Sequence, residues 1–351
     1  MNATYNEGMS NTVLHGRQKV AEPQPSSARR WLIVAAIVIV LLIVLTWTER
    51  SISENIADQG SVFGTFFQTF GEFPPVIVAC SATLMIIAAV HRLLGEGSGL
   101  HKLALALFSI LLALAGFLAV LDWAGQMMSY LRSWQDNAAK GLPIGQANND
   151  SSSTEGWSNF APGFFVAIII FIVLAIVVVT LVNKLSEEQL AAVIIAGLVA
   201  LCVVWAAHEI NTGMKSTWGR FRPYEVAAGK GEFTTWLQIN FPNGHRSFPS
   251  GHTEEGTMMA GIAILLLPFS KKAAKIMMWV GAIYGILMGL SRVLVAAHYP
   301  TDTVASFGLT FGLIAAGYVL IQRLQPRVDA FMAQRPRGGL AEDTQHPQPT
   351  H

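Results

Sequence analysis

The stretch HRSFPSGHT, residues 245–253, places basic and hydroxyl side chains directly before an apolar run, in a chain that is otherwise strongly hydrophobic. Pro249 favours a helix start, and Ser250 is a good cap for its first turn. Gly251 has no side chain to keep a ligand from the backbone amides. His252 falls in the first turn, where the free N–H groups of a helix attract an anion. A plain capped helix explains the proline and the serine but not the histidine, so the stretch predicts one wall of an anion site.

The composition around this stretch is that of a membrane protein. The chain has 351 residues, of which 52% are hydrophobic and only 13% are charged. This balance argues against the soluble classes. The net charge of +1 gives no basic excess for nucleic acid, and no nucleic-acid partner is expected. Cys80 and Cys202 both lie in apolar runs, so we interpret them as small core residues and not as a disulfide or a metal pair.

Eight apolar runs are long enough to cross a hydrocarbon core of about 30 Å. The first follows two arginines as a signal peptide would, but it has no small-x-small cleavage site, so we interpret it as a retained anchor helix. The fold class predicted is therefore all-α, a polytopic membrane helical bundle with about eight transmembrane spans. The runs lie at 31–47, 74–93, 102–124, 162–183, 189–209, 253–269, 276–297 and 303–322.

Lysine and arginine in the connections indicate the orientation. If the N-terminus is cytoplasmic, the inner segments hold 14 of the 23 Lys and Arg residues. Most of the other nine crowd into one outer region, residues 215–246. We expect both termini to be cytoplasmic, and the excess of outer cations needs a separate explanation.

The sequence KSTWGRFRP, residues 215–223, follows the fifth span and supplies part of that excess. Lys215 and Arg222 are seven residues apart, so on a continuous helix they would project from nearly the same face, about 10 Å apart along the axis. Both could then converge on one anion. Taken alone, the cluster could equally bind lipid headgroups.

A third polar stretch, SRVLVAAHYPTD, covers residues 291–302 at the outer end of the seventh span. Arg292 lies within an apolar helix, where a charge is costly unless it faces a partner or a polar cavity. An arginine that reaches out to the interface is the simpler interpretation. Asp302 falls in the first turn of the last span, where it could cap the helix, and it also lies within reach of His298.

The predicted orientation brings these three stretches to one outer membrane face. Three cations and two histidines without an aspartate cluster fit a phosphate site better than a metal site, and no cofactor is required. A neutral imidazole beside a carboxylate, as in His298 and Asp302, would be a nucleophile. His252 would protonate the leaving alkoxide. The sequence leaves open which histidine has which role, since the carboxylate beside His298 is the one local argument.

The three stretches together resemble the signature of the type 2 phosphatidic acid phosphatase superfamily, in particular its membrane lipid phosphate phosphatases. Eleven fixed residues match in order and spacing, from Lys215 to Asp302. The resemblance implies a six-helix, phosphatase-like core, metal-independent hydrolysis of phosphomonoesters or pyrophosphates, and contacts of Ser250 and Gly251 with phosphate. Membrane members have three spans before the first motif, whereas this chain has five, so nothing is carried over to residues before about 160.

Four segments are expected on this basis. Residues 1–30 and 323–351 would be disordered cytoplasmic tails, 31–160 would hold N-terminal spans and an outer loop, and 161–322 would form the catalytic membrane domain. The expected location is a bacterial inner membrane, with the site facing the periplasm. The sequence does not decide the oligomeric state.

The substrate expected for a site at headgroup height is a lipid of the bilayer. Candidates are phosphatidate, phosphatidylglycerophosphate, undecaprenyl pyrophosphate and a lipid A phosphate. Three alternatives share the same residues: a phosphotransferase between lipids, a non-catalytic transporter that binds anions, and a haloperoxidase holding vanadate. Transporters usually bind near the midplane and carry repeats, which this chain lacks.

Overall fold

The computed structural model describes residues 25–144 and 157–333. These residues form helices and no strand, which confirms the all-α prediction. Cys80 and Cys202 are free thiols. The helices are α1 Pro25–Ile56, α2 Val62–Phe70, α3 Pro74–Leu94, α4 Gly99–Ala139, α5 Trp157–Val182, α6 Glu187–Trp218, α7 Pro223–Ala227, α8 Gly251–Thr257, α9 Ile262–Leu266, α10 Lys271–Leu294 and α11 Pro300–Ala333, with a 3₁₀ segment, Met258–Gly261, between α8 and α9.

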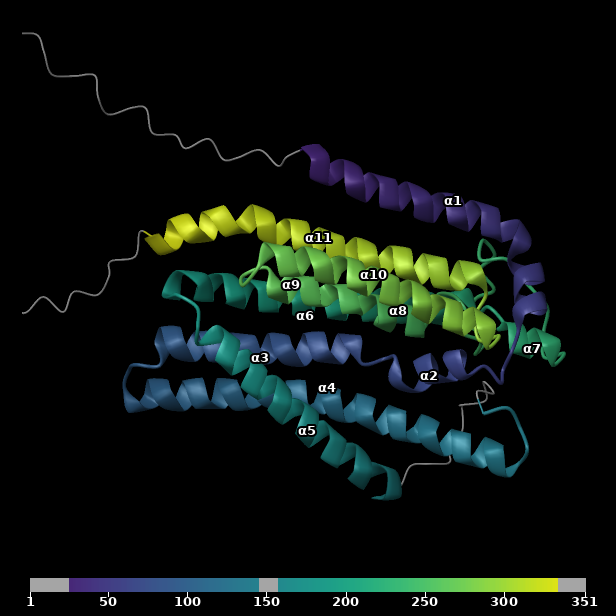
Figure 1. Ribbon diagram of the computed structural model, residues 1–351, viewed down its shortest axis with the longest axis horizontal. Coiled ribbons are helices and arrows are strands. Elements are labelled where there is room, and N and C mark those ends of the chain that lie inside the picture. The colour runs from purple at the N-terminus through teal and green to yellow at the C-terminus, as the bar shows by residue number, and fades with distance from the viewer. Residues whose placement is uncertain (1–24, 145–156, 334–351) are drawn as a thin grey trace, which may run out of the picture.

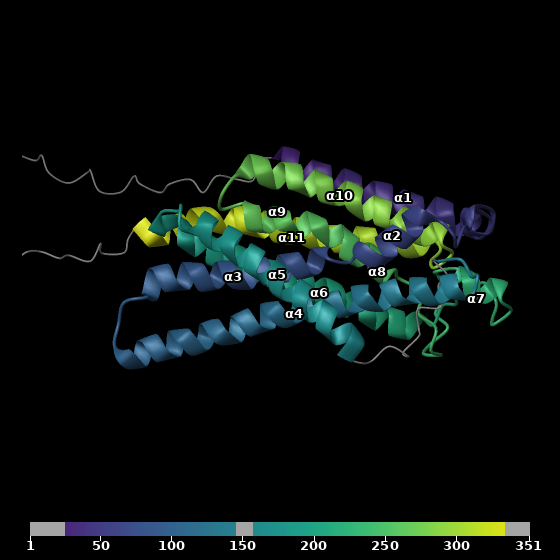
Figure 2. The same ribbon diagram turned by 60° about the horizontal axis from the view of Figure 1, so that its bottom comes forward.

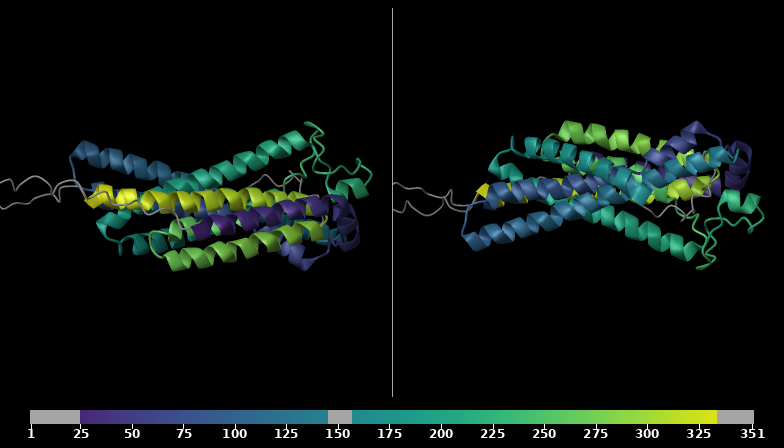
Figure 3. Two further views of the ribbon diagram at one scale, coloured as in Figure 1. Left: turned by 90° about the horizontal axis from the view of Figure 1, so that it is seen from above. Right: turned by 90° about the horizontal axis from the view of Figure 1, so that it is seen from below.

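The long helices run roughly side by side in one elongated bundle (Figure 1). α11 packs on α6 and on α1, while α3 packs on both α6 and α4. α5 crosses α3 and α4 obliquely (Figure 2). The short helix α7 and the connections around it lie at one end of the bundle (Figure 3). α1 runs toward this end, and α11 runs away from it.

Seven helices are long and apolar enough to cross a membrane by length and composition. Leucine, isoleucine and valine are largely exposed along α1, α4, α5 and α10. So much contiguous apolar surface is suited to lipid and not to water. The chain is therefore an integral membrane protein.

The eighth predicted span, 253–269, is in the structure a broken run of α8, a 3₁₀ segment and α9. Its 3₁₀ segment packs against α10, where a Cβ on Gly281 would lie only 2.0 Å from the backbone nitrogen of Ala260. The Thr257 hydroxyl donates to the carbonyl of Thr253 at 2.6 Å, a local bond that bends helices. The seven helices that qualify as spans among the described residues therefore do not include this run, and sequence hydropathy did not show its break.

The ends of the chain are more helical than predicted. α1 already begins at Pro25 and α11 continues to Ala333, whereas tails were expected to reach residue 30 and to start at residue 323. α4 likewise extends to Ala139, within the predicted outer loop. The remaining parts of both tails and of that loop lie outside the described residues.

Candidate active site

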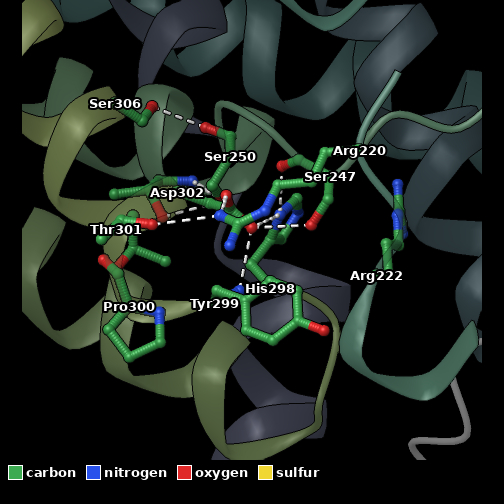
Figure 4. A network of polar contacts seen from close by, with 12 residues as sticks. Arg220, Arg222, Ser247, Ser250, His298, Tyr299, Pro300, Thr301, Asp302 and Ser306 are labelled. Atoms are coloured by element: carbon green, nitrogen blue, oxygen red, sulfur yellow. Dashed lines mark hydrogen bonds and ion pairs between the residues drawn. The ribbon is translucent and has the colours of Figure 1, made fainter. Parts of the chain in front are cut away.

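The three polar stretches meet at the end of the bundle that holds α7. The first covers the end of α6 and the start of α7, the second leads into α8, and the third joins α10 to α11. Gly219 ends α6 in the left-handed conformation, with φ of 56°, and so turns the chain toward α7. A backbone bond from Ser250 N to the carbonyl of Asp302, at 3.1 Å, ties the second stretch to the third. Figure 4 shows this junction at close range.

His298 is almost completely buried, with 1% of the residue exposed. Its Nδ1 lies 2.7 Å from the carbonyl oxygen of Ser247, which can only accept a hydrogen bond. Nδ1 therefore carries the hydrogen, and Nε2 carries the lone pair. Burial, with the charges of Arg222 and Lys215 adding to it, lowers the pKa of His298 to about 3 against the opposing pull of Asp302. The imidazole is thus neutral near pH 7, as a nucleophile must be.

Asp302 lies beside His298 as expected, but it is not the direct partner of the ring. Its Oδ2 is 3.6 Å from His298 Nδ1, farther than the Ser247 carbonyl. Oδ2 instead accepts from the Ser247 hydroxyl at 2.6 Å and from the Tyr299 amide at 2.8 Å. Asp302 therefore holds in place the same loop residue whose carbonyl fixes the tautomer of His298 (Figure 4).

Arg220 is the anchor of Asp302. Its Nη1 donates to Asp302 Oδ1 at 2.6 Å, and its guanidinium lies over the Tyr299 ring, 4.3 Å from the centroid. Nη2 donates to Oε1 of Glu49, a residue of α1, at 2.7 Å. Glu49 also accepts from the hydroxyl of Thr301. Glu49 of α1, Arg220 and Asp302 therefore form a fully buried network of two ion pairs that share Arg220.

Glu49→Ala should weaken this network. Arg220 keeps its ion pair with Asp302, but its buried Nη2 and the hydroxyl of Thr301 lose their acceptor. A buried hydrogen-bond donor left without a partner costs about 1–3 kcal/mol of unfolding free energy. We also expect kcat for phosphate release to fall roughly tenfold with little change in KM, since Arg220 would be held on one side only and would position Asp302 less firmly. Thermal unfolding in detergent and steady-state kinetics measure both effects.

Glu54 of the same helix provides the matched control. It pairs with Arg50 at 2.8 Å, but both side chains are about 60% exposed, at 60% and 61%. Exposed pairs contribute little, so Glu54→Ala should leave the melting temperature and kcat almost unchanged. Equal effects of the two variants would contradict a special role for Glu49.

Lys215 reaches the start of α8. Its Nζ occupies the place of a side chain at Gly251, since a Cβ there would be 2.5 Å from this nitrogen. The Ser250 hydroxyl caps α8 by accepting from the Thr253 amide at 3.4 Å, and its carbonyl accepts from the Ser306 hydroxyl at 2.6 Å. α8 has only seven residues, so side-chain cations supply more of the positive charge here than the helix end does.

Arg292 differs from Arg220 in having a donor to spare. It is 2% exposed and donates from Nη1 to Gln68 Oε1 at 3.3 Å, while its Nε is buried without a partner among residues 25–144 and 157–333. A buried guanidinium with an unused donor is unusual and calls for a ligand. Arg222 stands apart from the bonded network in Figure 4. Its charge and that of Lys215 lower the pKa of both His252 and His298, so the two cations lie near both rings.

His252 is surrounded by residues that the sequence analysis did not include. Its Nε2 lies 2.8 Å from Oε1 of Glu72, which sits between α2 and α3, and 3.4 Å from the hydroxyl of Tyr130 on α4. The carboxyl group of Glu255 lies beside that of Glu72, with one oxygen of each within 4.8 Å. Burial, and then the charges of Arg292, Lys215 and Arg222, lower the pKa of His252 well below its ordinary value.

Glu72, His252 and Glu255 also have the spacing of a possible metal site. One ligand atom from each lies within 4.8 Å of the others. The sequence predicted a site without metal because it showed no such cluster, and this arrangement comes from residues far apart in the chain. A chelator can therefore test whether catalysis needs a metal at these three residues.

All eight predicted site residues lie in this junction or border it: Lys215, Arg222, Ser250, Gly251, His252, Arg292, His298 and Asp302. Glu49 and Glu72, which reach these residues from the N-terminal half, were not predicted from the sequence. One signal was available, since Glu49 and Glu72 are carboxylates at the ends of apolar runs, where an acidic residue needs a partner.

Fold and site together define a class, the integral membrane proteins whose helix ends hold histidines among cations suited to phosphate. The family model of the PAP2 superfamily matches residues 188–326 of the chain. This segment contains all three polar stretches. No solved structure matches the chain.

One curated relative is similar over part of this segment. It is a lipid A 1-phosphatase of Rhizobium johnstonii, 37% identical over 73 residues. The match covers 20% of this chain and 27% of the relative. The chain thus spans about a quarter of the length of the curated relative that it matches.

Proposed function

We propose that the protein is a membrane lipid phosphate phosphatase that works through a phosphohistidine on His298. The observation that carries the proposal is the state of His298, which is buried and neutral, with Nδ1–H held by the Ser247 carbonyl. The PAP2 match and the relative named as a lipid A 1-phosphatase support a phosphatase. The apolar helices support a substrate that stays in the bilayer.

In the first step Nε2 of His298 attacks phosphorus, a P–N bond forms, and the P–O bond to the leaving group breaks. Lys215, Arg222 and Arg292 neutralise the charge on the non-bridging oxygens, and the free Nε of Arg292 supplies a donor for one of them. His252 gives its proton to the departing oxygen. The positive charge left on His298 is stabilised through Ser247 and Asp302.

In the second step water attacks the phosphohistidine and His252 takes its proton, so that inorganic phosphate leaves and His298 is neutral again. Protonation of His252 depends on the substrate. The three cations that lower its pKa are the same ones that a bound phosphate offsets, so the imidazolium form becomes favourable only when phosphate is present.

We further propose that the site faces the periplasm of a bacterial inner membrane, with both termini in the cytoplasm. This rests on the larger share of lysine and arginine in the opposite connections. Transfer of the phosphoryl group to a second lipid would use the same residues, and it differs only in the acceptor of the second step.

The test is phosphate release from a panel of lipid phosphates by the detergent-purified protein, with and without excess chelator. Release that persists in chelator is expected, because the cations and His298 supply the chemistry without metal. Loss of activity in chelator, restored by a divalent ion, would assign a metal to Glu72, His252 and Glu255 instead. Absence of release from every lipid would contradict the phosphatase, and appearance of the phosphoryl group on an added acceptor lipid without release of inorganic phosphate would indicate a transferase.

A further inference from the structure

The surroundings of His252 identify the part of the site that receives the leaving group. A general acid must hydrogen-bond to the oxygen that it protonates. Nε2 of His252 is instead bonded to Glu72 at 2.8 Å, so the Glu72 carboxylate lies at or beside the position of that oxygen. Glu255 extends the same acidic surface, since one carboxylate oxygen of Glu72, one of Glu255 and one ring nitrogen of His252 lie within 4.8 Å of one another.

The surface formed by Glu72, His252 and Glu255 is largely buried. The side chain of Glu72 is 11% exposed and that of His252 is 17% exposed. Oε2 of Glu255 is buried without a hydrogen-bond partner. A carboxylate oxygen accepts hydrogen bonds, so within the described residues Oε2 of Glu255 is an acceptor available to a ligand.

The charge therefore changes sign across the site. The transferred phosphate has Lys215, Arg222 and Arg292 around it, and the charges of Lys215 and Arg292 reach Glu255 from that side. Beside His252 lie the carboxyl groups of Glu72 and Glu255. A second phosphate in this position would be repelled, whereas an alcohol would be accepted and could donate to the free Oε2.

We infer that Glu72 and Glu255 are specificity-determining residues that select lipid phosphomonoesters, whose leaving group is a neutral alcohol, over lipid pyrophosphates. This rests on the proposed function and narrows it. Of the substrates considered, it favours phosphatidate, phosphatidylglycerophosphate and a lipid A monophosphate over undecaprenyl pyrophosphate. Glu72 and Glu255 select the leaving group, and His252 remains the general acid that protonates it.

The experiment compares kcat/KM for farnesyl monophosphate and farnesyl pyrophosphate, which share one tail, in the parent and in Glu255→Gln. The parent should prefer the monophosphate. The amide keeps the size and the hydrogen bonds of the carboxyl group but removes its charge, so the preference should shift toward the pyrophosphate by on the order of tenfold. Glu72→Gln should shift the preference in the same direction, and it serves in place of Glu255→Gln if that variant fails to fold.

Glu209→Gln is the matched control, because Glu209 is an exposed carboxylate of α6, and its ratio should equal that of the parent. A merely structural role would lower both activities together and leave the ratio unchanged. A parent that prefers the pyrophosphate, or ratios unchanged in both variants, would overturn the inference while leaving the phosphatase intact. No release from either substrate by the parent would overturn the proposed function and the inference with it.

Discussion

His298→Ala is expected to lower phosphate release from a lipid phosphate by about 10⁴-fold or more. The alanine removes the atom that forms the P–N bond, and neither Ser247 nor Asp302 can replace it, since both are already engaged in hydrogen bonds. The measurement is release of inorganic phosphate in detergent. A second measurement uses radiolabelled substrate, which should leave an acid-labile label on the parent and none on the variant.

The control for this variant is His208→Ala, which changes an exposed histidine of the same protein. It should keep the activity and the label of the parent. Retention of the label in His298→Ala would show that another residue is the nucleophile. A variant that unfolds can be replaced by His298→Asn, which keeps a side chain able to donate to the Ser247 carbonyl.

His252→Ala should have the second largest effect, and the effect should depend on the leaving group. For a lipid phosphate, loss of the general acid is expected to lower kcat by about 10²- to 10⁴-fold. An aryl phosphate needs little protonation, so phosphorylation of His298 should survive with that substrate. Hydrolysis of the phosphohistidine still needs His252 as base, so the enzyme should accumulate in the phosphorylated form.

Rapid mixing with p-nitrophenyl phosphate measures this directly. A burst of nitrophenolate that matches the amount of enzyme, followed by a slow steady rate, is the result expected for His252→Ala. If kcat falls equally for lipid and aryl phosphates and no burst appears, His252 does not act by protonating the leaving group. The roles of the two histidines would then be reversed or shared.

Much of the site could be predicted from the sequence because its cations and histidines lie in three short stretches. The expected alignment of Lys215 and Arg222 on one helix was wrong, because α6 ends at Trp218 and Gly219 turns the chain between them. α10 likewise ends at Leu294, between Arg292 and His298. The starts of α8 and α11 at Gly251 and Pro300 also follow local rules for capping and for proline.

The remainder depends on contacts between distant segments, which no local rule contains. Glu49 and Arg220 are 171 residues apart, and His298 and Ser247 are 51 apart. The sequence placed the carboxylate of Asp302 beside His298, four residues away, whereas a backbone carbonyl of another loop lies closer to the ring. The break in the predicted span 253–269 arises in the same way, from packing against glycines of α10.

The N-terminal helices have a consequence for how this protein could be divided or recombined. Residues 188–326 carry the superfamily match, but Glu49 of α1 accepts a hydrogen bond from Arg220, and Glu72 holds His252 from the loop before α3. A chimera that grafts this segment onto other membrane helices would leave Nη2 of Arg220 buried without its acceptor and would free His252 from Glu72. The matched segment is therefore not a portable module, because α1 and the loop before α3 complete the junction that holds both histidines.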